Sequence, residues 1–267
     1  MLKDITIGQY FPGKSCIHRL DPRFKIIITA IFIAMLFTAD TFFSLSIGIV
    51  FMLITILLSK VPLKLIVKSL KPIVPIIIFT AVLNILFIDG GKTLVDWGII
   101  EITSEGIRTS AFMIIRIIAL IAGTSLLTYT TSPITLTDAI ERLLSPLKKL
   151  KLPVHELAMM MTIALRFIPT LIEETDKIMS AQKARGADLE TGGLMQRAKA
   201  LIPILIPLFV SAFRRAEELA LAMECRCYHG GEGRTRLKQL KALPNDYFAL
   251  FISFVFLGAV ITLDIFI

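Results

Sequence analysis

Cysteine and the familiar catalytic motifs are what this sequence has least of. Its 267 residues include three cysteines, Cys16, Cys225 and Cys227, and so small and odd a number predicts no disulfide framework. His155-Glu156 lacks the second histidine of an H-E-x-x-H zinc helix. The sequence also has no G-x-S-x-G motif. We therefore expect a non-catalytic chain that carries no cofactor and no metal.

Apolar residues are abundant instead, at 55% of the chain, with a mean hydropathy of +0.77. Soluble domains are about 45–50% apolar, so the composition indicates a membrane protein. The net charge of +8 suits a membrane surface or nucleic acid, but nothing here resembles a nucleic-acid-binding module. The first residues lack an apolar core after a basic start, so we expect no cleaved signal peptide.

The distribution of charge predicts an all-α integral membrane protein with about five transmembrane helices. Asp40 is the single charged residue between residues 26 and 58. One helix over that run would span about 50 Å, against about 30 Å of hydrocarbon, so we expect two helices that turn near Asp40. Asp21-Pro22 is a suitable start for the first, with an acceptor at the cap and proline at the first helical position. Further spans are expected at 73–88, 109–130 and 246–267.

Basic residues set the expected orientation, because cytoplasmic loops collect lysine and arginine. They stand on both sides of the helix pair that turns at Asp40, so both of its ends are expected inside and Asp40 outside. Counting the spans gives a multi-pass protein of the cytoplasmic membrane with its N-terminus inside and its C-terminus outside. The side chains of Arg23 and Lys25 are expected to snorkel to the interface. The basic residues are Arg19, Arg23 and Lys25 before the pair, and Lys60, Lys64, Lys68 and Lys71 after it.

Charged groups within the expected spans are few, and they bear on whether the chain could transport a solute alone. Arg116 should face protein or water, since a charge in lipid is costly. With Asn84 and Asp264 it makes a thin set of polar groups for a transport pathway near the bilayer midplane. A stand-alone integral-membrane carrier stays open as the alternative function.

The chain divides by composition into a membrane part at 1–130, a charged block at 131–245 and a final span from 246. The block is expected to be cytoplasmic and to hold three coupling-type helices, two of them long, amphipathic and about 45–50 Å in length. An apolar run at 200–213 could be counted as a sixth span, but it contains two prolines and has basic residues at both ends. The three helices are expected at 137–149, capped by Thr137, at 155–186, and at about 195–228, stopped by Gly230-Gly231.

The two long helices end alike, in AQKARGADLETGG (181–193) and AMECRCYHGGEGR (222–234). Alignment of Arg185 with Arg226 gives an offset of 41 residues. Two matched helix ends suit a partner with two subunits, although a basic residue is also common near the negative end of a helix dipole. A zinc site is the other interpretation, in which Cys225, Cys227 and His229 would join Cys16 and His18. Residues two apart on a helix point about 200° apart, however, which favours small packing residues at the two cysteines of the helix end.

These features together resemble the transmembrane T component of energy-coupling factor transporters. The resemblance rests on GQYFPGKSCIHRLDPR (8–23), the triplet Ala184-Arg185-Gly186, and MECRCYHGGEGRTR (223–236) with its preceding helix. It implies a coupling subunit of an ATP-driven importer of vitamins or other micronutrients. Two ABC-type ATPases would dock below it, and a small substrate-binding membrane protein, the S component, beside it. The implied ATPase-docking residues are Ala184, Arg185, Gly186, Cys225, Arg226 and Cys227.

The second motif departs from the family pattern, because Cys227 stands where Ala-Arg-Gly would have its glycine. We therefore expect that helix to end at Gly230 or Gly231 rather than by a left-handed turn at position 227. The apolar faces of the two long helices are expected to hold the S component. The residues expected in this contact are Met159, Met160, Ile163, Leu201, Leu205 and Phe209.

Overall fold

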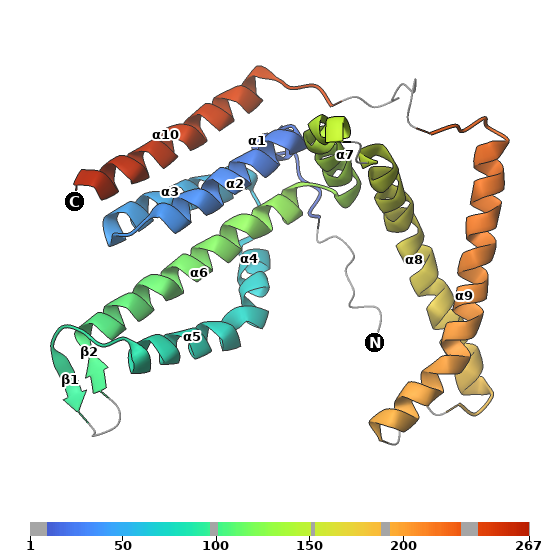
Figure 1. Cartoon of the computed structure of the whole chain (residues 1–267), viewed down its shortest axis with the longest axis horizontal. Coiled ribbons are helices and arrows are strands. Elements are labelled where there is room, and N and C mark those ends of the chain that lie inside the picture. Colours follow the sequence, from blue (N-terminus) through green and yellow to red (C-terminus); the bar gives the residue numbers. More distant parts are fainter. Residues whose placement is uncertain (1–9, 97–100, 151–152, 188–192, 231–239, 267) are drawn as a thin grey trace. The chain divides into compact units, whose positions relative to one another are not determined.

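The computed structural model describes residues 10–96, 101–150, 153–187, 193–230 and 240–266. The predicted all-α architecture is confirmed there, apart from an antiparallel hairpin of β1 (Thr93–Asp96) and β2 (Glu101–Thr103) (Figure 1). The chain forms two units. Among the described residues, the bundle unit holds the chain up to Ala139 together with the segment from Leu240 onward, and the two-helix unit starts at Ile140 and holds the next two long helices.

Four helices build the core of the bundle unit: α2 (Pro22–Thr38), α3 (Phe42–Ser59), α6 (Ser104–Thr130) and α10 (Pro244–Phe266). Each has a local reason for its start. Asp21 caps α2, with Pro22 in the first turn, as predicted, and Thr41 and Ser44 form a capping box on α3. The core side chains include Phe32, Met35, Leu36, Leu45, Met52, Ala119, Leu126 and Val260.

Five stretches are long and apolar enough to cross a membrane, and four of them correspond to predicted spans. These are α3, α6, α10 and Leu63–Phe87, which comprises α4 (Leu63–Leu70), the short turn η2 (Lys71–Ile73) and α5 (Val74–Phe87). The fifth is α8 (Val154–Ala184) rather than α2. α2 has 17 residues, about 26 Å of helix, at the lower limit for a span. The prediction of a start at residue 109 was wrong, because Thr103 already caps α6 by accepting from Gly106.

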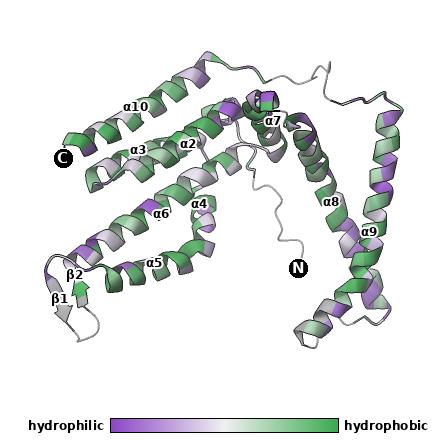
Figure 2. Ribbon diagram, viewed as in Figure 1, coloured by the Kyte–Doolittle hydropathy of each residue, from purple (hydrophilic) through white to green (hydrophobic). Residues whose placement is uncertain are grey.

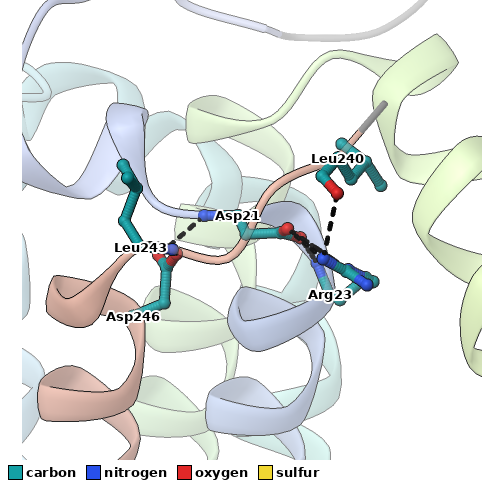
Figure 3. Close-up of polar contacts among 5 residues, drawn as sticks. All are labelled: Asp21, Arg23, Leu240, Leu243 and Asp246. Atoms are coloured by element: carbon teal, nitrogen blue, oxygen red, sulfur yellow. Dashed lines mark hydrogen bonds and ion pairs between the residues drawn. The ribbon is translucent and has the colours of Figure 1, made fainter. Parts of the chain in front are cut away.

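α2 and α10 run parallel, and a hydrogen-bonded cluster joins them at each end. At their starts, the buried Asp246 carboxylate accepts from the backbone N–H of Asp21 (2.9 Å) and of Leu243 (2.6 Å), while Arg23 pairs with Asp21 (Figure 3). At the far ends, Asp264 accepts from the Thr41 hydroxyl at 3.0 Å. The parallel arrangement agrees with the predicted topology, in which both helices cross in the same direction.

Replacing Asp246 with alanine is expected to destabilise the bundle unit by about 2–4 kcal/mol. The side chain is buried, so its loss would leave two backbone N–H donors without an acceptor, each costing about 1–3 kcal/mol. The thermal unfolding midpoint of the full chain in mild detergent measures this. The matched control is Asp40→Ala, at an exposed aspartate, and an equal drop in both variants would contradict the assignment.

Two basic residues of the bundle unit are held by carbonyl oxygens near helix ends. The prediction that the Lys25 side chain snorkels to the interface was wrong, because this side chain is buried. Its ammonium group donates to the Thr130 carbonyl (2.9 Å) at the C-terminus of α6 and to the Thr131 hydroxyl (3.3 Å). Arg116 faces protein, as predicted. Its guanidinium donates to the Ala39 carbonyl and lies 4.6 Å from the centre of the Phe112 ring.

The charged block contains the expected helices with shifted boundaries. α7 (Pro133–Leu144) begins earlier than predicted and continues as the 3₁₀ turn η3 (Ser145–Leu150). Ser132, not Thr137, is the capping residue, since its side chain accepts from the Thr135 N–H at 3.4 Å, while Thr137 lies inside the helix. α8 and α9 (Leu194–Glu224) are 31 residues each. α9 contains the run 200–213 and is not among the five candidate spans in the described part of the chain.

Candidate docking site at the helix ends

α8 and α9 of the two-helix unit run in opposite directions and contact each other where they cross (Figure 1). Glu174 of α8 accepts a hydrogen bond from the Ser211 hydroxyl and pairs with Arg215 at 3.0 Å. Glu174 and Arg215 are 41 residues apart, which is also the offset between Arg185 and Arg226. Because equivalent positions of the two helices meet at this ion pair, the helices are related by an approximate twofold axis near it.

A second cross-link between the helices uses a carbonyl that Pro207 leaves free in α9. In a regular helix the N–H of residue 207 would donate to the carbonyl of residue 203. Pro207 has no N–H, so the Pro203 carbonyl lacks this donor. The side-chain amide of Gln182 donates to that carbonyl at 3.3 Å instead. Pro207 therefore frees one carbonyl oxygen of α9, and a side chain near the C-terminus of α8 donates to it.

Arg185 and Arg226 lie at opposite ends of this antiparallel pair. Each is about 16 Å along its helix from the Glu174–Arg215 contact, at 1.5 Å per residue. Both side chains are exposed, and within the described part of the chain neither guanidinium makes a hydrogen bond or an ion pair. The structure therefore presents two equivalent arginines, one at each end of a cross-linked helix pair.

The end of α8 is closed by a left-handed glycine. The N–H of Gly186 donates to the Lys183 carbonyl (3.0 Å), and the N–H of Ala187 donates to the Gln182 carbonyl (3.0 Å). Gly186 has a φ of +86°. This is the Schellman arrangement, in which a left-handed residue lets the last carbonyls find donors.

The end of α9 has the same hydrogen bonds 41 residues later. The N–H of Cys227 donates to the Glu224 carbonyl (2.9 Å), and the N–H of Tyr228 donates to the Met223 carbonyl (3.1 Å). Cys227 itself takes the left-handed conformation, with a φ of +55°. The prediction that α9 continues to Gly230 or Gly231 was wrong, because the hydrogen-bonded turn imposes the left-handed conformation although the residue is not glycine.

We expect opposite effects from exchanging the left-handed residues at the two ends. Gly186→Ala should destabilise the end of α8 by about 1 kcal/mol, and Cys227→Gly should stabilise the end of α9 by a similar amount. No atom would contact an added Cβ at Gly186, so the cost there lies in the backbone alone.

Amide hydrogen exchange measures these effects, because about 1 kcal/mol changes the local opening equilibrium about fivefold. Exchange should accelerate at Ala187 in Gly186→Ala and slow at Tyr228 in Cys227→Gly. Cys225→Gly is the matched control. Cys225 has a right-handed φ of −60°, so glycine there should loosen the helix end. Faster exchange at Tyr228 in Cys227→Gly would contradict the assignment.

The expected S-component residues form an exposed apolar surface in the two-helix unit. Leu201, Leu205 and Phe209 recur every four residues on α9 and are 49%, 45% and 60% exposed. On α8, Met160 is exposed, while Met159 and Ile163 are half-buried. Figure 2 shows hydrophobic and hydrophilic stretches mixed along both helices. The surface is therefore available for a partner, and α9 contributes more of it than α8.

The residues considered for zinc have other surroundings. The ring nitrogens of His18 lie 2.7 Å from the Ser15 hydroxyl and 3.0 Å from the Phe11 carbonyl. Cys225 and Cys227 are exposed at the end of α9. Among the described residues, no group of three or more potential metal ligands comes together.

Known proteins match the chain over almost its whole length. The family model described as CbiQ, cobalt transport protein, matches residues 13–237. Three curated relatives bear the name energy-coupling factor transporter transmembrane protein EcfT. The relative from Clostridium kluyveri is 60% identical over 93% of each chain. The relative from Ruminiclostridium cellulolyticum is 54% identical over 99% of this chain and 98% of its own. The relative from Bacillus subtilis is 48% identical over 98% of both.

Proposed function

The chain belongs to the CbiQ family and is a transmembrane component of an energy-coupling factor transporter, and we propose that it is the subunit that couples two ABC-type ATPases to a substrate-binding S component. In this proposal the chain itself is non-catalytic, and ATP hydrolysis takes place in its partners. The imported solute is a vitamin or another micronutrient, and the S component recognises it.

The observation that carries the proposal is the equivalence of the two helix ends. Arg185 and Arg226 occupy the same position in the same hydrogen-bonded turn, at opposite ends of one antiparallel pair. Two similar ATPases require two similar contacts, and the approximate twofold relation of α8 and α9 supplies them. A guanidinium carries a rigid fork of five donors, which suits carboxylates and helix-end carbonyls in a groove of each ATPase.

Cross-links between α8 and α9 favour transmission of force through this unit. The ion pair of Glu174 with Arg215 and the bond from Gln182 to Pro203 join the helices at two levels. A displacement of either helix end by its ATPase would therefore move both helices. The exposed apolar surface of Leu201, Leu205 and Phe209 lies on the same pair, so an S component held there would move with it.

The test is the composition of the complex purified through this chain in mild detergent. The proposal predicts two ATPase subunits and a small membrane protein with each copy of the chain. A stand-alone carrier, the alternative, would purify without ATPases and would take up its solute in vesicles that contain no ATP.

A further inference from the structure

We propose that α4 and the start of α5 form a binding site for an anionic phospholipid of the bilayer. The site is the lysine groove, an open groove of about 440 Å³ lined by Lys64, Val67, Lys68, Leu70, Lys71 and Val74. It belongs to the bundle unit and is separate from the helix ends proposed to dock the ATPases.

Two parallel rows of side chains give the lysine groove its character. Lys64, Lys68 and Lys71 follow one another at spacings of four and three residues, so they share one face of the helix. Val67, Leu70 and Val74 form the adjacent row at the same spacings. A ligand that fits both rows has an anionic group and an apolar chain side by side, as a phospholipid does.

Charge around the groove favours an anion. The sequence contains no aspartate or glutamate between Asp40 and Asp89, which covers all of α3, α4 and α5. Lysines three and four residues apart repel one another on a helix. Within the described part of the chain, the ammonium groups of Lys64, Lys68 and Lys71 make no hydrogen bond or ion pair. An external phosphate would neutralise this cluster.

Packing holds the groove open toward the bilayer. Val61 and Ile66 are buried in the bundle, and the Tyr129 hydroxyl of α6 donates to the Leu65 carbonyl at 3.0 Å. These contacts fix one side of α4 and leave Val67, at 64% exposed, on the open side. Figure 2 shows hydrophilic positions on α4 next to the largely hydrophobic α5. The expected orientation puts the lysines at the cytoplasmic leaflet, where basic pockets bind anionic headgroups.

Native mass spectrometry of the full chain in mild detergent tests the proposal, with palmitoyl-oleoyl-phosphatidylglycerol as the probe. We expect this lipid to bind and the zwitterionic phosphatidylcholine with the same chains to bind far more weakly. The triple variant Lys64→Gln, Lys68→Gln, Lys71→Gln should lower the affinity for phosphatidylglycerol roughly 100-fold, at about fivefold for each lysine.

A matched triple variant, Lys149→Gln, Lys177→Gln, Lys199→Gln, removes the same charge from exposed lysines elsewhere and should keep the lipid. Val67→Ser should weaken lipid binding while all three groove lysines remain. The proposal is overturned if both triple variants lose the lipid equally, if phosphatidylcholine binds as tightly, or if an equal concentration of inorganic phosphate displaces the lipid. The last result would mean that the groove recognises phosphate alone.

Discussion

Replacing Arg185 and Arg226 together with glutamate is expected to leave the chain folded in the membrane and to release both ATPases. Each arginine is exposed at a helix end, so reversal of its charge removes a donor fork without disturbing a core. Truncation of a central interface arginine typically costs at least 2 kcal/mol, about 30-fold in affinity, and reversal adds repulsion. The measurement is the amount of each ATPase that co-purifies with the variant.

The matched control for this pair is Arg166→Glu with Arg214→Glu. These arginines are also exposed, one on α8 and one on α9, and the change in charge is the same. They lie away from the helix ends, so both ATPases should be retained. Each single variant at Arg185 or Arg226 should weaken the complex without abolishing it, because the other contact keeps the partner nearby. Retention of both ATPases by the double variant Arg185→Glu, Arg226→Glu would disprove the docking role.

Replacing Leu205 with arginine is expected to remove the S component and to keep both ATPases. Leu205 lies in the middle of the exposed stripe with Leu201 and Phe209. Burial of such a side chain contributes about 1.5–3 kcal/mol, so its replacement by a charge should lower the affinity at least about tenfold. Quantitative mass spectrometry of the purified complex separates the two kinds of partner.

Met195→Arg is the matched control for the apolar stripe. Met195 is also an exposed apolar residue of α9, at 73%, but it lies near the start of the helix. The S component should remain bound to this variant. If Leu205→Arg lost the ATPases and kept the S component, the assignment of the two surfaces would be reversed.

Much of the fold follows from local patterns in the sequence. The lone Asp40 in a long apolar run indicated a turn between two helices, and the structure has α2 and α3 on either side of it. Likewise Pro153 and Gly186 closely bracket α8. These signals work because length, hydropathy and capping chemistry act over a few neighbouring residues.

Contacts between distant segments were beyond the reach of those patterns. Lys25 looks like an ordinary interfacial lysine until α6 brings the Thr130 carbonyl to it. Asp246 looks like a residue before a span, although it joins α10 to α2. No periodicity in the sequence specifies which helix end or backbone N–H will lie opposite such a side chain.

The two helix ends show both the strength and the limit of motif reading. The 41-residue offset identified Arg185 and Arg226 as equivalent, and the structure gives them equivalent hydrogen-bonded turns. The absence of glycine at position 227 suggested a longer helix, which was wrong. Residue preference for the left-handed conformation is only about 1–2 kcal/mol, and the hydrogen bonds of the turn outweigh it here.

The most direct test of the coupling role is the mass and subunit composition of the complex that this chain forms in its own membrane. The chain is purified in mild detergent, and the intact assembly is weighed by native mass spectrometry. We predict one copy of the chain with two ABC-type ATPases and one small membrane protein. A chain that purifies without ATPases, and that alone supports solute uptake into ATP-free vesicles, would contradict the account.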